Sequence, residues 1–313
     1  MRALITGITG QDGSYLAERL VADGVEVHGT TRDVSAAHEH LRAIRDRVQL
    51  HACDLGNVEA LELLVARCAP DRCFHFASQS YIGGEDARMG FNIASTFALL
   101  DAVSRQAPRA RVLVAGSAAQ VAGAASSPQN ELTPSAPTST YGLAKQLSAD
   151  AVRFFREQRG MHACTAILYN HESARRSMHF ISKKLARGAA RISLGLQTHV
   201  EIGDLGARRD WGYAPDYVEG MALLLEHPTA TDVVFATGRS HTVEEMADLT
   251  FAAAGLKARD HLVVRDDLVR RSDPVLLVGN AARANQLLGW APRMPFDEML
   301  ARMVSFELAA LRS

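Results

Sequence analysis

The sequence lacks several features that would mark other classes of protein. No apolar run reaches the roughly 20 residues that a membrane-spanning helix needs. The formal net charge of −1 at pH 7 gives no overall field that attracts nucleic acid or an anionic membrane. A strand-like run over Arg2–Thr6 follows Met1 almost at once and leaves no room for a signal peptide. We therefore expect a cytoplasmic protein that works without nucleic acid or membrane and holds any anionic ligand locally.

Cysteine is scarce, and its placement excludes the usual metal motifs. The four cysteines show no C-x-x-C spacing, and without a signal peptide they indicate reduced thiols in the core. Histidine is plentiful, with twelve residues, and His38 and His40 form an H-x-H pair. No cysteine or carboxylate follows that pair at the spacing of a metal site. The sequence therefore predicts no metal ion.

The first half of the 313-residue chain alternates short apolar runs with amphipathic helical patterns. Strict alternation indicates parallel βαβ units and an α/β fold with a doubly wound Rossmann sheet. The expected strands are Arg2–Thr6, Val25–Thr30, Val48–Ala52, Cys73–Ala77, Val112–Ala115 and Ala163–Leu168. The expected helices are Ser14–Asp23, Val58–Cys68, Asn92–Arg105 and Tyr141–Arg159.

From Tyr169 onward the alternation loosens. One short apolar run, Val233–Ala236, predicts a further strand, so the second lobe should interleave with the first domain. Helical patterns recur at Phe180–Ala190, Pro215–His227, Val243–Ala254, Ala281–Leu288 and Phe296–Leu311. We expect a Rossmann domain over residues 1–168, joined by about 205–238, and a smaller α/β substrate-binding lobe from residues 169–204 and 239–313.

A glycine-rich turn joins the first expected strand to the first expected helix. Its glycines permit a tight turn and let backbone amides approach a pyrophosphate at the start of the helix. Glycine also marks ordinary turns, but the position between a strand and a helix favours an NAD(P)-type cofactor. The expected cofactor-binding residues of this turn are Gly7, Thr9, Gly10, Gln11, Asp12 and Gly13.

Residues at the ends of the second and third strands bear on the choice of cofactor. An acidic Asp33 would hold a ribose hydroxyl, whereas Arg32 would hold a 2′-phosphate, so the two signals conflict. Because the arginine comes first, the sequence favours NADP, with NAD as the alternative. Asp54, together with Leu55, is placed to meet the adenine, although a lone Asp54 could equally cap a helix.

The pair Tyr141 and Lys145 is the sharpest chemical signal in the sequence. Four residues apart on a helix, the two side chains share one face. A phenol titrates near pH 10, and a nearby ammonium favours the phenolate and lowers its pKa. Lys145 is one of only four lysines among 34 basic residues, and it can also hold the cofactor's ribose. The two residues are the predicted catalytic pair and also contact the cofactor; an exposed helix pair is the alternative.

Together with the glycine turn, this pair resembles the extended short-chain dehydrogenase/reductase superfamily. The chain as a whole resembles the GDP-mannose 4,6-dehydratase family, and three blocks carry the resemblance: residues 7–18, 168–176 and 209–219. The resemblance implies a GDP-linked sugar as substrate. The residues that it places at the substrate are Gln79, Ser80, Gln120, Ser139, Asn170, Arg175, Lys184, Arg209, Arg270 and Asp273.

Some of these positions carry implied roles. Asn170 should bind the diphosphate through its amide, and Lys184 and Arg209 should neutralise phosphate charge. Arg175 should reach the sugar or the diphosphate. Arg270 should bind the nucleotide. Asp273 stands at the position where the family has a Glu that contacts the nucleotide's ribose.

Two positions depart from the family's pattern. After the fifth strand the family carries a Thr that hydrogen-bonds the sugar's 4-hydroxyl and, two residues later, a Glu that takes the proton from carbon 5. Here these positions are Ala118 and Gln120. Gln cannot accept a proton at neutral pH. Ser117 is the candidate replacement for the Thr if the loop shifts, and Glu131 aligns with a residue outside the chemistry.

Three hypotheses follow from these departures. The first is an enzyme that oxidises or reduces carbon 4 through Tyr141 and Lys145, giving a 4-keto sugar, a 4-epimer or a reduced product. The second is a true 4,6-dehydratase with an unusual base. The third is a non-catalytic subunit that binds NADP and a nucleotide sugar.

The resemblance also implies an assembly. In the superfamily, the helices that correspond to Asn92–Arg105 and Tyr141–Arg159 pair across a dimer axis, and here they carry apolar residues on more than one face. We therefore expect a homodimer. The family's tetramer uses the loop that corresponds to Asp33–His38, so a tetramer is the further expectation.

Overall fold

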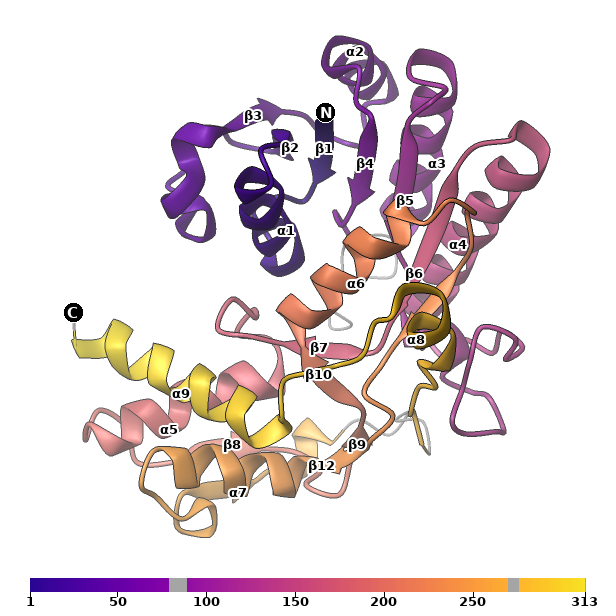
Figure 1. Cartoon of the computed structure of the whole chain (residues 1–313). Helices are drawn as coiled ribbons and strands as arrows, with labels where there is room; N and C mark the ends of the chain where they lie inside the picture. The colour runs from indigo at the N-terminus through magenta and orange to yellow at the C-terminus, as the bar shows by residue number, and fades with distance from the viewer. Residues whose placement is uncertain (79–88, 270–275, 313) are drawn as a thin grey trace.

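The computed structural model of the protein describes residues 1–78, 89–269 and 276–312 (Figure 1). Its centre is a seven-stranded parallel sheet in the order β11-β6-β5-β4-β1-β2-β3. The strands are β1 (Arg2–Thr6), β2 (Glu26–Thr31), β3 (Val48–Ala52), β4 (Arg72–His75), β5 (Arg111–Ala115), β6 (Ala163–Leu168) and β11 (Val233–Phe235). The order reverses between β1 and β4, and open α/β sheets bind ligands beyond the carboxyl ends of strands at such a point.

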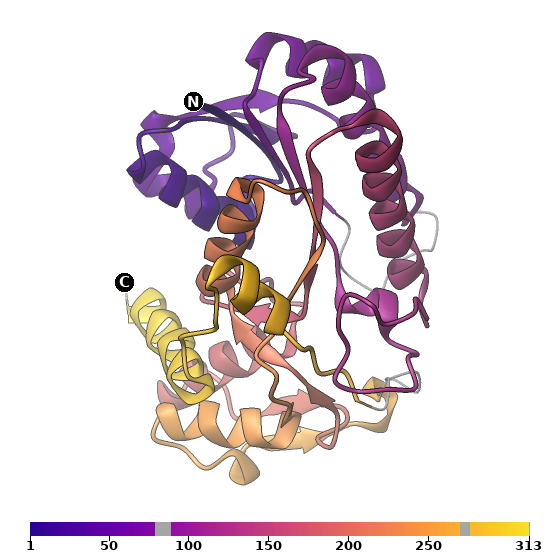
Figure 2. The same cartoon turned by 45° about the vertical axis from the view of Figure 1, so that its right-hand side comes forward.

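Helices cover both faces of the sheet (Figures 1 and 2). On β1, Ala3 and Ile5 enter one hydrophobic cluster and Leu4 enters another, because successive strand residues face opposite sides. Burial on both faces explains why the inner strands β1, β5 and β6 are largely apolar, whereas the outer strands β2 and β3 also carry polar side chains. The covering helices are α1 (Gln11–Ala22) and α6 (Ala214–Glu226) on one face, and α2 (Val58–Cys68), α3 (Met89–Gln106) and α4 (Thr140–Arg159) on the other.

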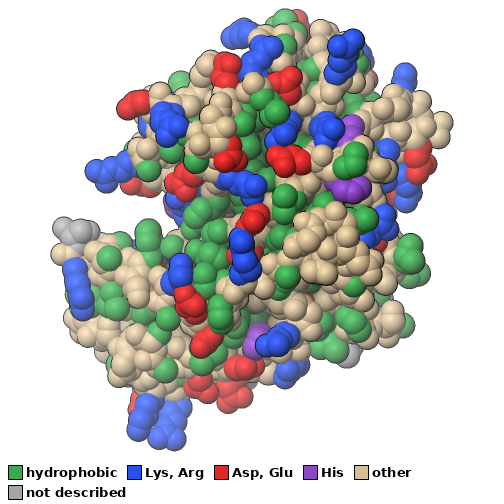
Figure 3. All heavy atoms as spheres, in the orientation of Figure 1, with side chains coloured by type: hydrophobic (Ala, Val, Ile, Leu, Met, Phe, Trp, Pro, Cys, Tyr) green, Lys and Arg blue, Asp and Glu red, His purple; other side chains and the backbone are tan. Residues whose placement is uncertain are grey.

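A second lobe lies below the sheet in Figure 1 and has its own core. Its main helices are α5 (Ile181–Ser193), α7 (Val243–Ala253) and α9 (Phe296–Arg312), and α8 (Ala282–Leu288) lies beside α6. Three pairs of short strands complete it: β7 (Asn170–Glu172) with β10 (Trp211–Tyr213), β8 (Val200–Ile202) with β13 (Leu262–Val264), and β9 (Arg208–Arg209) with β12 (His241–Thr242). In the space-filling view of Figure 3, the surface is indented between the two lobes.

The expected α/β fold with a doubly wound parallel sheet is confirmed. The main differences lie at element ends: the first helix begins at Gln11 rather than Ser14, and the strand expected over Cys73–Ala77 ends at His75. The short strands of the second lobe were not expected, because two or three residues carry no periodic signal. All four cysteines are buried and free, as expected of core thiols. None of the described helices combines the length and apolarity that a membrane crossing requires.

Candidate functional site

The glycine turn stands at the point where the strand order reverses. Gly7 has a φ of +72°, which favours glycine, and a Cβ there would lie 2.8 Å from the backbone nitrogen of Ala77 beyond β4. A Cβ on Gly13 would lie 2.3 Å from the carbonyl oxygen of Gly7. Gly10 caps α1 and donates from its backbone N–H to Gly7 at 3.0 Å, with the half-buried Thr9 between them. The backbone therefore packs here in a way that side chains would prevent.

The side chains of Gln11 and Asp12 attach this turn to the segment that follows β6. The Gln11 amide donates to the carbonyl oxygen of His171 at 3.1 Å and accepts from the Ser173 hydroxyl at 2.8 Å. The Asp12 carboxylate lies 3.0 Å from Nε2 of His171. Two of the three sequence blocks that carry the family resemblance thus meet at the start of α1.

The polar side chains at the ends of β2 and β3 occupy different surroundings. Arg32 is exposed directly after β2. The Asp33 carboxylate accepts from the Ser35 backbone N–H at 2.8 Å and from the Ser35 hydroxyl at 2.6 Å, and these bonds hold its pKa below the usual value. The Asp33 carboxylate is therefore already hydrogen-bonded within its own turn, to Ser35.

Past β3, Asp54 stabilises a turn rather than a helix end. Its carboxylate accepts from the Gly56 backbone N–H at 2.9 Å, whereas α2 is capped by Asn57, which accepts from Ala60 at 3.0 Å. Leu55 is buried. The alternative reading of Asp54 as a helix cap is wrong, because Asn57 fills that position.

Tyr141 and Lys145 lie at the start of α4, against the end of β5. Ser139 caps the helix by accepting from the Gly142 backbone N–H at 3.1 Å. The Lys145 ammonium is buried and donates to the carbonyl oxygen of Ala115 at 2.7 Å. Its Nζ lies 5.8 Å from the centre of the Tyr141 ring. Burial lowers the pKa of Lys145 to about 8, against the attraction of Asp12.

The expected effect of this lysine on the phenol is not what the structure shows. Burial raises the pKa of Tyr141 above the usual 10.0, and a hydrogen bond with Ser117 and the charge of Arg176 offset that only in part. The Lys145 ammonium does not offset the burial, since it donates to the carbonyl oxygen of Ala115. The prediction of a lowered phenol pKa is therefore wrong.

The loop after β5 carries the two positions that depart from the family, in the short helix η3 (Ala118–Val121). Ser117 caps this helix by accepting from Ala119 at 3.2 Å. The side chains of Ala118 and Gln120 are both buried, and the Gln120 amide oxygen has no hydrogen-bond partner among the described residues. η3 packs closely on α4, because a Cβ on Gly142 would lie 2.4 Å from the carbonyl oxygen of Ala119. An unpaired amide oxygen thus lies in the loop whose Ser117 contacts Tyr141.

The residues assigned to the substrate are distributed over both lobes. Asn170 begins β7 beside Trp211 of β10, and Lys184 lies in α5. Arg209 ends β9 and pairs with His241 of β12. The remaining assigned positions Gln79, Ser80, Arg270 and Asp273 lie outside the described residues.

Arg175 is directed at α1. Its guanidinium donates to the Ser14 hydroxyl at 3.0 Å and to the Glu18 carboxylate at 2.5 Å, and it stacks 4.0 Å from the centre of the Tyr15 ring. The neighbouring Arg176 pairs with the Glu172 carboxylate at 2.9 Å and stacks 3.5 Å from the centre of the Phe180 ring, and its charge acts to lower the pKa of Tyr141 and of Asp12. The sequence assigned a role to the first arginine and none to the second, since adjacent identical residues give no signal that separates them.

His171 is a further residue of this region to which the sequence gave no role. Its Nδ1 lies 2.8 Å from the carbonyl oxygen of Tyr169, and its Nε2 lies 3.0 Å from the Asp12 carboxylate. Neither partner can donate, so both ring nitrogens donate and the ring is an imidazolium. Burial acts to lower the pKa of His171, but Asp12 outweighs it and the net shift is upward. The ring also stacks on Tyr217 with centroids 5.0 Å apart.

Comparison with known proteins gives one consistent result. A family model described as GDP-mannose 4,6 dehydratase matches residues 4–303. Arabidopsis thaliana GDP-mannose 4,6 dehydratase 1 is 36% identical over 98% of this chain and 89% of its own length. The Homo sapiens GDP-mannose 4,6 dehydratase is 34% identical over 99% of this chain and 92% of its own length.

Solved structures share the fold. A putative epimerase from Burkholderia cenocepacia J2315 has a TM-score of 0.87 and 25% identity, covering 98% of both chains. RMD from Pseudomonas aeruginosa, solved with NADPH, has a TM-score of 0.84 and 23% identity, covering 99% of both chains.

Proposed function

Since the chain belongs to the GDP-mannose 4,6 dehydratase family, we propose that it is an NADP-dependent enzyme that oxidises or reduces carbon 4 of a GDP-linked sugar. The membership confirms the resemblance seen in the sequence, and it makes the protein an enzyme of the nucleotide-sugar epimerase and dehydratase type. The proposed reaction differs from that of a 4,6 dehydratase in one step, because it does not remove water.

The glycine turn supports a dinucleotide cofactor. Gly7 and Gly13 let the backbone of the turn pack where a Cβ would clash with Ala77 and with the turn itself, and the amino end of α1 offers backbone N–H groups to a pyrophosphate. A nicotinamide cofactor bound there supplies hydride transfer to or from the sugar. The exposed Arg32 is placed to pair with a 2′-phosphate, and Asp33 is held by Ser35. These observations favour NADP over NAD.

Tyr141 is the proposed proton carrier at the sugar's 4-hydroxyl. Burial keeps the phenol protonated in the protein alone, so formation of the phenolate depends on positive charge nearby. Arg176 supplies such charge, and the Ser117 hydroxyl supports the phenolate by hydrogen bonding. The phenolate oxygen then takes the hydroxyl proton as hydride leaves carbon 4, and the reverse transfer reduces a ketone.

Gln120 is the observation that carries the proposal. Loss of water after oxidation requires a base that removes the proton from carbon 5, and a neutral amide cannot do this. An amide oxygen in that position can accept a hydrogen bond but cannot take a proton from carbon. Glu131 is no substitute, because its carboxylate accepts from the Val234 backbone N–H at 2.8 Å at the edge strand β11. We therefore propose that the reaction ends at a 4-keto sugar, a 4-epimer or a reduced product.

The reaction is tested by following cofactor reduction in absorbance with several GDP-sugars. The unaltered enzyme should reduce NADP⁺, and Tyr141→Phe should lower the rate by at least about 100-fold, the usual worth of a general acid–base group. Tyr213→Phe is the matched control, because that phenol contacts Arg302 rather than η3. No reduction with any GDP-sugar would favour the non-catalytic subunit.

The guanine assignment has its own test. We propose that GDP stabilises the protein more than UDP or dTDP does, since Asn170, Lys184 and Arg209 stand at the family's positions for a GDP-sugar. Ligand binding raises the melting temperature through RT ln(1 + [L]/Kd), so equal concentrations rank the nucleotides directly. An equal or larger shift with UDP would remove the guanine assignment and leave the nucleotide-sugar class.

A further inference from the structure

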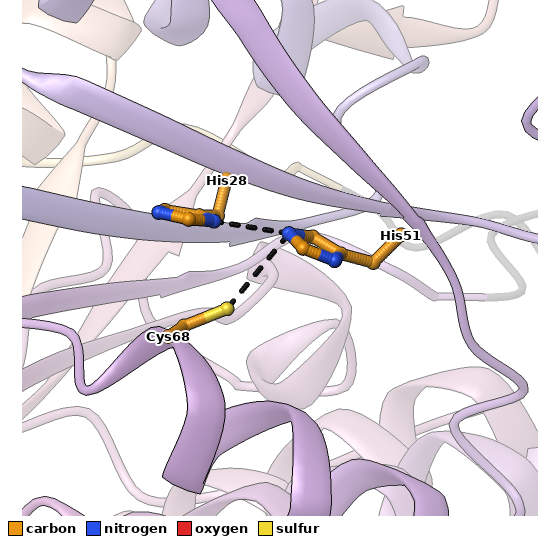
Figure 4. Close-up of side chains that lie close together, drawn as sticks. All are labelled: His28, His51 and Cys68. Atoms are coloured by element: carbon orange, nitrogen blue, oxygen red, sulfur yellow. Dashed lines mark hydrogen bonds between the residues drawn. The ribbon is translucent and has the colours of Figure 1, made fainter.

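Three ligand-type side chains meet under the outer strands of the sheet (Figure 4). His28 comes from β2, His51 from β3 and Cys68 from the last turn of α2. Nδ1 of His28 lies 3.0 Å from Nε2 of His51, and the Cys68 sulfur lies 3.9 Å from the same Nε2. All three atoms lie within 4.8 Å of one another. Among the described residues, this is the one group of His, Cys, Asp or Glu with atoms converging in this way.

A fourth residue fixes the tautomer of the first histidine. Nε2 of His28 lies 3.1 Å from the Glu26 carboxylate, which also accepts from Gln49 at 3.0 Å. A carboxylate cannot donate, so Nε2 carries the proton and Nδ1 presents its lone pair to His51 and Cys68. A carboxylate behind a histidine is the usual support of a metal ligand, because it sets both the tautomer and the ring orientation.

We propose that His28, His51 and Cys68 bind one Zn²⁺ ion. Zinc bonds of 2.0–2.1 Å to nitrogen and about 2.3 Å to sulfur imply tetrahedral separations of about 3.4 Å between nitrogens and about 3.6 Å between nitrogen and sulfur. The observed 3.0 Å and 3.9 Å each differ from these by about 0.4 Å or less. Two imidazoles and one thiolate suit zinc better than magnesium or calcium, which prefer oxygen ligands.

The surroundings favour a structural ion with a water as its fourth ligand. His28 and Cys68 are 6% and 2% exposed, whereas His51 is only half-buried and leaves one side open to solvent. His28 stands four residues before Arg32 and His51 three residues before Asp54, and none of the three proposed ligands is an expected cofactor or substrate residue. An ion here would join β2, β3 and α2, three elements of the sheet domain, without taking part in the reaction.

Zinc content and affinity test the proposal on the full-length, tag-free protein. After zinc loading and desalting, mass spectrometry should find one zinc per chain, and zinc should raise the melting temperature. Cys68→Ala and His51→Ala should each lose the ion and the thermal shift. Glu26→Gln should keep all three ligands but bind zinc about 10–100-fold more weakly, as expected when a supporting carboxylate is lost.

Matched control variants distinguish zinc bound at this site from zinc bound non-specifically elsewhere on the protein. Cys53→Ala and His199→Ala remove a cysteine and a histidine outside the cluster and should leave one zinc per chain. Cobalt bound to the unaltered protein should show the visible absorption of tetrahedral thiolate ligation, and Cys68→Ala should abolish it. Zinc that persists in Cys68→Ala and His51→Ala, or a protein that takes up Cu⁺ but no Zn²⁺, would overturn the proposal.

Discussion

Nε2 of His171 lies 3.0 Å from the Asp12 carboxylate, and this pair joins β7 to the first turn of α1. The segment after β6 is thereby fixed to the glycine turn. Since Tyr169 accepts from the other ring nitrogen, the histidine is held as an imidazolium. The pair therefore links the predicted cofactor loop to the segment that carries Asn170.

The pair makes stability depend on pH in a defined direction. The pKa of His171 is raised above 6.5, so its contribution is complete below that value and is lost as pH rises through the raised pKa. The pKa of Asp12 is lowered below 3.8, so its contribution is complete above that value and is lost as pH falls further. The pair should therefore stabilise the protein most between about pH 4 and pH 6.5.

His171→Asn tests this dependence by chemical denaturation across pH. The variant should lose on the order of 3 kcal/mol of unfolding free energy near pH 5, the usual cost of breaking a buried ion pair, and less at high pH. His199→Asn is the control, because that histidine is exposed. A loss that is equal at pH 5 and pH 9 would contradict the charged pair.

Cofactor preference should depend on Arg32. A charge-assisted bond to a 2′-phosphate is worth about 1.5–3 kcal/mol, so Arg32→Ala should weaken NADP binding by about 10–150-fold and leave NAD binding nearly unchanged. Arg109→Ala removes an exposed arginine just before β5, at the other end of the strands, and serves as the control. Fluorescence titration measures both cofactors. Tighter binding of NAD by the unaltered protein would show that Asp33 determines the preference.

The outer face of α3 and α4 predicts a homodimer. Phe97, Leu143, Leu147 and Phe154 are each between 41% and 50% exposed, which is unusual for large apolar residues on packed helices. A second copy of the chain would bury them. Light scattering should give a dimer for the unaltered protein, a monomer for Leu147→Glu and a dimer for the control Leu63→Glu on α2. A monomer of the unaltered protein at micromolar concentration would remove the idea.

The pattern of apolar residues in the sequence was sufficient to predict most strands and helices of the sheet domain. The strands Arg2–Thr6 and Ala163–Leu168 are found with their expected bounds, because buried parallel strands are nearly continuous apolar runs. The edge strand Val48–Ala52 also has its expected bounds, although it carries Gln49 and His51. Tyr141 and Lys145 were also predictable as a pair, since a helix places residues four apart on one face. Local spacing was sufficient in each of these cases.

Contacts between distant segments could not be predicted in the same way. Burial raises the pKa of Tyr141, and the sequence suggested the opposite shift, because burial depends on tertiary packing that local spacing does not report. His28, His51 and Cys68 stand 17 and 23 residues apart and meet only through the register of β2 with β3 and the packing of α2. The choice between Arg175 and Arg176 likewise depends on where α1 lies.

The central claim is that oxidation at carbon 4 is retained and loss of water is not. Gln120 stands where the family has a base, and general-base catalysis is worth about 10²–10⁴-fold. Gln120→Glu should therefore increase water loss by a comparable factor, and Gln158→Glu on α4 is the control, because that side chain is exposed.

The most direct measurement is mass spectrometry of the product that the unaltered enzyme makes from GDP-mannose and NADP⁺. We predict that the nucleotide sugar keeps the oxygen at carbon 6, with no 4-keto-6-deoxy product above trace. Efficient conversion to the 4-keto-6-deoxy sugar by the unaltered enzyme would contradict the account and restore the plain dehydratase.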